Sequence, residues 1–176
     1  MILVTPLSAI DFSIRRYQPS HMVTLLSPEH MIPAWSGIHP DRHLRLPLED
    51  VSEAFLSDSA PSADHIDRLV AFGRGWNAEA PMLVHCWAGI SRSMAAAFTL
   101  LCDKLEPGRE LEIARAIRAR APHAYPNRLM VQLADDALRR EGRMVSAVEE
   151  IGRGIIVAEG TCVELPLSLD DLASGG

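Results

Sequence analysis

The pattern of hydrophobic and polar positions predicts strands that alternate with helices over most of the chain. Short runs that are apolar or alternate with polar residues are typical of strands, and they lie at 2–4, 21–27, 43–48 and 81–86. Helical spacing of apolar residues, or flanking caps and prolines, marks 8–17, 62–76, 91–105, 109–120 and 127–142. This alternation predicts the α/β class, with a central, mostly parallel sheet flanked by helices.

Two of these helices have recognisable ends. Ser62 is a predicted N-cap, and Asn127 is predicted to cap a last helix that ends near Gly142. The arginines of "RAIRAR", 115–120, are expected on a solvated helix face, because their neighbours supply the apolar stripe.

The pattern changes after residue 142. We therefore expect a first domain over 1–142 and a C-terminal extension over 143–176. In the extension, "GIIVAEGTCVEL" contains two β-rich runs around Glu159-Gly160, which predicts a β-hairpin. Our hypothesis is that this hairpin completes or covers a sheet edge. The end, "DDLASGG", is expected to fray.

Composition narrows the function classes. Hydrophobic residues make up 48% of the 176, too many for a disordered chain. The formal charge of −6, without a basic block, argues against nucleic acid and against an anionic membrane surface as partners. The start does not have the pattern of a secretory signal, and no apolar stretch approaches the length of a membrane span.

Cysteine usage indicates a reducing compartment. Cys86, Cys102 and Cys162 are too few and too scattered for a disulfide framework, so we expect a cytoplasmic protein. No cluster of histidines and cysteines has metal-ligand spacing, so neither a metal nor a cofactor is expected. Cys102 is expected in the core, whereas Cys162 has no predicted place. The oligomeric state is left open.

The stretch "LVHCWAGISRSMAAA", 83–97, carries the candidate chemistry. An apolar strand ends at His85 and a helix begins near Ser91, so the chain between them must turn sharply. Gly89 permits the positive φ that a tight curl needs. Backbone N–H groups curled at a helix N-terminus bind a tetrahedral oxyanion, and the fork of Arg92 can grip two of its oxygens.

The same environment favours the ionised form of Cys86. A helix N-terminus and a nearby arginine both stabilise a thiolate, which is the nucleophilic form of cysteine. The Ser93 hydroxyl is placed to donate a hydrogen bond to the Cys86 sulfur when that sulfur has to act as a leaving group. The His85 ring is expected to fix the loop by bonding a nearby carbonyl.

The arrangement His85-Cys86-x5-Arg92-Ser93 resembles the signature of the cysteine-dependent protein tyrosine phosphatases. The length and element order over about 20–140 look most like small dual-specificity members, and "HCWAGISRS" looks especially like bacterial ones. The resemblance implies hydrolysis of phosphotyrosine in protein substrates through a phosphocysteine, and it leaves open whether phosphoserine and phosphothreonine are substrates too. It implies no cofactor and a phosphate held by Trp87, Ala88, Gly89, Ile90, Ser91 and Arg92.

The resemblance also implies an aspartate as general acid, on a loop after a strand upstream of the cysteine. Asp50 in "LPLEDVSEA" matches that place, and Asp58 is the alternative. A second reading makes Asp50 a helix cap in a capping box with Glu53. Two further aspartates, Asp64 and Asp67, are expected on a helix face.

Two residues near the loop each allow two interpretations. Asn127 in "YPNRLMVQL" resembles a Pro-Asn segment that supports the signature loop in the family, and the alternative is a plain N-cap. Trp87 is expected to pack inward rather than to flank the pocket.

Two other functions compete with a phosphatase. One is a phosphopeptide-binding module without turnover, and the other is a rhodanese-like sulfurtransferase, which also uses a cysteine between strand and helix. Intact Cys86, Arg92 and Asp50 favour the phosphatase. The loop from Trp87 to Ser91 is uncharged, which disfavours phosphoinositides and RNA triphosphates. Whether the enzyme is tyrosine-only or dual-specific is left open.

Overall fold

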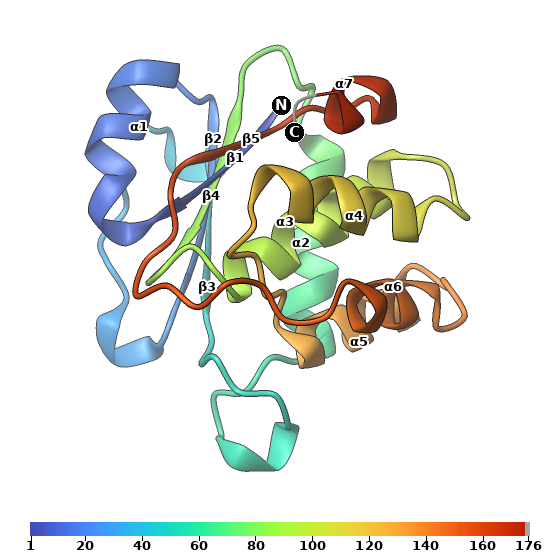
Figure 1. The fold of residues 1–176 in the computed structure, drawn as a ribbon. Coiled ribbons are helices and arrows are strands. Elements are labelled where there is room, and N and C mark those ends of the chain that lie inside the picture. Colours follow the sequence, from blue (N-terminus) through green and yellow to red (C-terminus); the bar gives the residue numbers. More distant parts are fainter. Residues whose placement is uncertain (175–176) are drawn as a thin grey trace.

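A five-stranded sheet organises the molecule (Figure 1). The computed structural model describes residues 1–174. The order across the sheet is β3-β2-β4-β1-β5. The strands are β1 (Ile2–Pro6), β2 (His21–Leu26), β3 (His43–Pro47), β4 (Met82–Cys86) and β5 (Val163–Leu165).

The first four strands are parallel, and β5 pairs antiparallel with β1 at one edge. The predicted α/β class with a mostly parallel sheet is confirmed. Parallel pairing brings the carboxyl ends of the strands together: Cys86 lies opposite Pro6, and His85 lies opposite Thr24. Because β4 lies between β1 and β2, its last residue, Cys86, lies in the middle of the row formed by the carboxyl ends of the parallel strands.

Helices cover both faces of the sheet. On one face, α1 packs over Leu3, Met22 and Leu83. The other face carries the larger core, in which α3 is buried along most of its length. Among residues 1–174, no helix combines the length and the apolar character needed to cross a membrane. The helices are α1 (Ile10–Tyr17), α2 (Ala63–Gly75), α3 (Arg92–Lys104), α4 (Glu110–Arg120), α5 (Arg128–Ala137), α6 (Arg143–Ile151) and α7 (Leu169–Ala173).

Both predicted N-caps are present, but the predicted end of one helix is wrong. Ser62 caps α2 in a capping box with His65, and the Asn127 side chain caps α5, as predicted. The prediction that α5 ends near Gly142 is wrong, because α5 ends at Ala137 and Gly142 instead begins α6. The buried carboxylate of Asp135 explains this, since it accepts N–H groups at the start of α6 and holds the chain in a second helix.

The C-terminal extension differs from its prediction. Within 143–174 the two β-rich runs do not pair as a hairpin. The first run is held by the body of the protein, where the Ile155 N–H donates to the Pro122 carbonyl, and the second forms β5 against β1. Each run thus has its own partner. A single strand completes the sheet edge that the hairpin was expected to complete or cover.

The expectation of a frayed end fails for most of that segment. Residues 169–173 form α7, whose Leu172 is buried in the main core, while 175 and 176 lie outside the described residues. Met144, Ala147 and Val148 of α6 belong to the same core. Residues 143–174 therefore share one hydrophobic core with the preceding chain.

The arginines of α4 hold this extension. The Arg118 guanidinium donates to the carbonyls of Ile151, Gly152 and Ala124 at 2.7, 2.9 and 2.8 Å. Arg120 donates to the Leu172 carbonyl at 2.7 Å. The expectation of a solvated face is therefore wrong for these two residues, because carbonyls, most of them in a distant segment, accept their hydrogen bonds. Arg115 is exposed and pairs with Glu150.

Replacing Arg118 by lysine should destabilise the fold. An ammonium group cannot reach all three carbonyls with the geometry of the guanidinium fork. We expect Arg118→Lys to lower the free energy of unfolding by about 2 kcal/mol, the effect of one or two lost hydrogen bonds. Urea denaturation measures it as a lower midpoint with an unchanged m-value. Arg115→Lys is the matched control and should change little, because its ion pair is exposed; equal midpoints for both variants would contradict the prediction.

Candidate active site

The Cys86 thiol lies at the carboxyl end of β4 and is 2% exposed. The Gly89 N–H donates to its Sγ over 3.3 Å. The Ser93 hydroxyl lies 3.1 Å from the same sulfur. The expected contact between Ser93 and the sulfur is thus present. Both partners are donors suited to a thiolate.

Three carbonyls of the loop after Cys86 point away from its centre. The Trp87 carbonyl accepts the Leu7 N–H at 3.0 Å, the Ala88 carbonyl accepts the Gly160 N–H at 2.8 Å, and the Ile90 carbonyl accepts the Tyr125 N–H at 2.9 Å. In a trans peptide the C=O and the N–H point in opposite directions. The N–H groups of Ala88, Gly89 and Ser91 therefore point inward.

Glycine is required at position 89 for two reasons. Its φ is +70°, a conformation that other residues rarely adopt. A Cβ there would also lie 2.8 Å from the Pro6 nitrogen at the end of β1. The tight curl predicted from the sequence is therefore formed, with β1 directly behind it.

Arg92 supplies a buried cation beside this loop. Its residue is 6% exposed, and one terminal nitrogen donates to the Leu48 carbonyl at 2.9 Å. The buried Nε has no hydrogen-bond acceptor among residues 1–174. A buried donor is costly to leave unpaired, so this nitrogen is suited to an anion. Together with the inward N–H groups, it forms an anion-binding site above Cys86.

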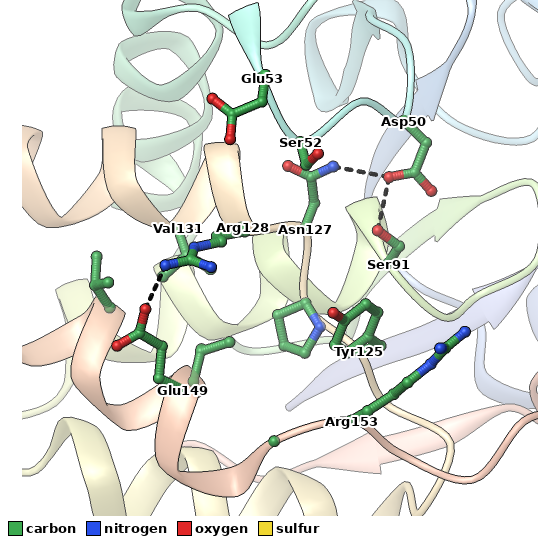
Figure 2. A pocket seen from close by; sticks show the side chains of 14 residues that line it. Asp50, Ser52, Glu53, Ser91, Tyr125, Asn127, Arg128, Val131, Glu149 and Arg153 are labelled. Carbon is green, nitrogen blue, oxygen red and sulfur yellow. Dashed lines mark hydrogen bonds and ion pairs between the residues drawn. The ribbon is translucent and has the colours of Figure 1, made fainter.

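Asp50 faces the same site from the loop that follows β3. Figure 2 shows Ser91 and Asn127 both directed at its carboxylate; Oδ1 accepts their donors at 2.6 and 2.8 Å. The other oxygen, Oδ2, lies 3.8 Å from the Arg92 Nε. The capping-box reading of Asp50 and Glu53 is wrong, because the turn at 54–56 has no side-chain cap and the Asp50 carboxylate is held elsewhere.

The other aspartates lie away from this cluster. Asp58 is exposed on the loop between β3 and α2. Asp64 and Asp67 are exposed on α2, as expected, and Asp64 pairs with Arg68 at 3.7 Å. Asp50 is thus the aspartate that the structure brings to Arg92.

Asn127 combines the two readings given to it. Its Oδ1 accepts the Met130 N–H at the start of α5, and its Nδ2 donates to Asp50 and to the Val51 carbonyl. Its own N–H also donates to the Ser91 carbonyl at 3.3 Å. One residue therefore caps a helix, holds the Asp50 loop and contacts the end of the signature loop.

Behind Cys86, a buried chain of polar groups crosses the sheet. His85 Nδ1 lies 3.4 Å from the Cys86 carbonyl, and its Nε2 lies 2.7 Å from the Thr24 hydroxyl. That hydroxyl lies 2.8 Å from His43 Nε2, and the Trp35 N–H donates to His43 Nδ1. The expected bond from His85 to a carbonyl is present. Thr24 and His43 had no sequence signal, since only strand pairing brings them together.

One proton arrangement satisfies this chain with both rings neutral. His85 Nδ1–H donates to the carbonyl, Thr24 donates to His85 Nε2, and His43 Nε2–H donates to Thr24. Burial lowers the pKa of both His43 and His85 to about 4. Both rings are therefore neutral at physiological pH, as the arrangement requires.

The rim of the site carries aromatic side chains. Trp87 is 54% exposed and packs edge-on against His30, so the expectation that it packs inward is wrong. The loop turns its backbone N–H groups inward and leaves this side chain outside. Tyr125 is 48% exposed, with the Arg153 guanidinium over its ring. A cavity of about 620 Å³ opens beside Asp50 and Ser91 and extends past Tyr125 toward α6 (Figure 2).

The other two cysteines lie apart from this chemistry. Cys102 is buried in the core, as predicted, and burial raises the pKa of its thiol. Cys162 lies just before β5, where the Ser13 hydroxyl donates to its sulfur at 3.6 Å. All three cysteines are free thiols.

Comparison with known proteins agrees with the geometry. The mouse dual specificity protein phosphatase 12 is 32% identical to this chain over an alignment of 114 residues, which covers 59% of this chain. The chain spans about a third of that relative, since the match covers 32% of it. No family model matches the chain.

Solved structures share the fold. The crystal structure of DUSP15 superposes with a TM-score of 0.58 at 21% identity, covering 84% of this chain and 86% of that one. The structure of human DUSP28 gives 0.54 at 18% identity, with 86% and 95% covered.

The chain therefore has the fold of these phosphatase structures, and it is similar in sequence to a dual-specificity phosphatase over 59% of its length. The narrower likeness to bacterial members stays an expectation, because these relatives include mouse and human proteins.

The two neutral histidines should make stability depend on pH. Their folded pKa of about 4 lies below the ordinary value of 6.5, so below pH 6.5 the unfolded chain binds more protons than the folded one. Stability is therefore complete above pH 6.5 and decreases as the pH falls toward 4. Between these two pH values, each histidine changes the free energy of unfolding by up to about 1.4 kcal/mol per pH unit.

His43→Gln isolates this effect from the carboxylates, which titrate in both proteins. Urea denaturation at several pH values between 4 and 7 should give a shallower decline for the variant than for the wild type. Parallel curves for the two proteins would show that His43 is not held neutral by its burial.

Proposed function

We propose that this protein is a phosphomonoesterase that hydrolyses phosphotyrosine in protein substrates through a phosphocysteine. The observation that carries the proposal is the Cys86 thiol below inward N–H groups and a buried Arg92, with Asp50 facing them. This arrangement matches a tetrahedral dianion bound with its phosphorus next to the sulfur.

In the first step the Cys86 thiolate attacks phosphorus. The S–P bond forms and the P–O bond to the leaving group breaks, with its electron pair going to that oxygen. The N–H groups of Ala88, Gly89 and Ser91 and the Arg92 guanidinium stabilise the charge on the transferring group. These donors are fixed before substrate arrives, so little reorganisation is needed.

Asp50 acts as general acid toward the leaving oxygen. Ser91 and Asn127 occupy its Oδ1, so Oδ2, which faces Arg92, is the oxygen that carries the proton. Transfer of this proton releases a neutral phenol or alcohol. In the second step Asp50 removes a proton from water, which attacks phosphorus and breaks the S–P bond.

Ser93 assists the departure of the sulfur. The S–P bond leaves its electron pair on Cys86, and the Ser93 hydroxyl, 3.1 Å away, donates a hydrogen bond to the thiolate. Inorganic phosphate is released and the enzyme returns to its first state.

The competing functions are less consistent with the site. A phosphopeptide-binding module and a rhodanese-like sulfurtransferase both use a loop of this kind without an acid for an oxygen leaving group. The hydrogen bonds that direct Asp50 at Arg92 favour hydrolysis over both.

We assign the chemistry to residues 1–142, which contain Cys86, Arg92 and Asp50, and a supporting part to the extension. Exposed aromatic side chains at the rim, Trp87 and Tyr125, support a protein substrate over a small one. Three free thiols support a reducing compartment, and we place the enzyme in the cytoplasm.

The test of the proposal is hydrolysis of p-nitrophenyl phosphate with EDTA present. This ester has a good leaving group, so the assay reports on the nucleophile and the loop. We expect turnover by the wild type and none by Cys86→Ser, because a serine hydroxyl is not ionised at neutral pH. Cys102→Ser is the control and should keep its turnover. Release of phosphate by Cys86→Ser at the wild-type rate would exclude a phosphocysteine.

The role of Asp50 predicts a dependence on the leaving group. Asp50→Asn should lower kcat for phenyl phosphate by roughly 10²- to 10⁴-fold, the usual range for loss of a general acid. The loss should be smaller for p-nitrophenyl phosphate, whose leaving group needs less protonation. Asp58→Asn is the matched control on the same loop. If it instead shows the leaving-group dependence, Asp58 is the acid.

A further inference from the structure

We infer that the Gly160 N–H, from the C-terminal extension, is a positioning group for the signature loop. It fixes the peptide between Ala88 and Gly89 so that the Gly89 N–H points at the Cys86 sulfur. The expected fall in kcat/KM rests on the proposed phosphatase activity, whereas the expected change in the reactivity of the Cys86 thiol does not.

The two hydrogen bonds involve opposite sides of one peptide unit. The Ala88 carbonyl accepts the Gly160 N–H at 2.8 Å, and the Gly89 N–H donates to Cys86 Sγ at 3.3 Å. Since C=O and N–H of a trans peptide point apart, a donor that holds the carbonyl outside also holds the N–H inside. Rotation of this peptide would break both bonds and turn a carbonyl oxygen toward the thiolate.

The approach of the extension to the loop requires glycine at position 160. A Cβ there would lie 2.5 Å from His123 Nε2 and 3.1 Å from the Gly89 carbonyl oxygen. His123 is itself buried, so its ring has little room to move. Glycine is therefore needed at position 160 because a side chain there would collide with His123.

The extension is held on both sides of Gly160. Before it, the Ile155 N–H donates to the Pro122 carbonyl, and Arg118 binds the carbonyls of Ile151 and Gly152. Next to it, the Ser8 hydroxyl donates to the Glu159 carboxylate, and β5 follows within a few residues. In Figure 1 this orange-red segment leaves α6 and passes the light-green loop on its way to β5. A segment tethered at both ends can hold a peptide in one orientation.

The experiment removes the donor and follows the thiol. Gly160→Pro deletes the N–H, and glycolic acid at position 160 replaces it by an ester oxygen without adding a side chain. The rate of Cys86 alkylation by iodoacetamide is measured against pH, in a Cys102→Ser, Cys162→Ser background. We expect the midpoint of this profile to move to higher pH, because the thiolate loses a fixed donor.

We also expect kcat/KM for p-nitrophenyl phosphate to fall roughly fivefold, the effect of one hydrogen bond. Gly75→Ala is the matched control, because a Cβ there meets nothing within 4 Å. Its alkylation profile should match that of the background protein. Thermal unfolding identifies a variant that fails to fold, and the ester form then gives the decisive comparison, since it keeps the shape of the chain.

The outcomes separate the two proposals. An unchanged alkylation profile in the folded ester protein overturns the positioning role of Gly160, whatever the turnover. A shifted profile together with no turnover in the wild type supports the positioning role and overturns the proposed phosphatase activity. A shifted profile with reduced turnover supports both.

Discussion

The site depends on one constraint, the outward orientation of the carbonyls in the loop after Cys86. Each carbonyl of Trp87, Ala88 and Ile90 is held by a backbone N–H from outside the signature. Because a peptide unit is rigid and planar, these external donors decide which way the internal N–H groups point. The inward direction of the N–H groups in this loop is therefore set by segments that lie outside the signature.

A second layer of contacts holds the Asp50 carboxylate in the same way. Asn127 caps α5, holds Asp50 and bonds the end of the signature loop, so the position of a helix is linked to the position of a carboxylate. The buried chain from His85 through Thr24 to His43 fixes the other end of the loop across three strands. The Cys86 thiol and the Asp50 carboxylate are thus both held by groups on rigid elements, as preorganised electrostatic stabilisation would require.

The local parts of this site were predicted from spacing, and the family resemblance pointed to Asp50 and Asn127, but other distant partners were missed. Gly89, Arg92 and Ser93 lie within seven residues of Cys86, so their spacing alone indicated the loop and its contacts. Strand positions and the caps at Ser62 and Asn127 followed from periodicity and residue type. Gly160 and Thr24 could not be found this way, because nothing local distinguishes them before the sheet pairs.

The errors have the same origin. Two β-rich runs in the extension looked like a hairpin because they are adjacent, but each has a better partner elsewhere. Arg118 looked solvated because its own helix leaves it on the surface, and two of the three carbonyls that it binds, those of Ile151 and Gly152, lie more than thirty positions away. Trp87 was expected inward because it is apolar, whereas the curl of the backbone decides where it points.

The pairing of β5 with β1 has a consequence for synthesis on the ribosome. Ile2 pairs with Leu165, so the edge of the sheet next to the earliest strand stays open until residue 165 has left the exit tunnel. Until then β1 presents unpaired backbone groups, and the Ala88 carbonyl has no Gly160 N–H to bind. A nascent chain can collapse around α3 well before this point, and Leu7 and Tyr125 can already hold two carbonyls of the loop. The peptide that directs an N–H at the Cys86 sulfur, however, gains its donor only when residue 160 has emerged.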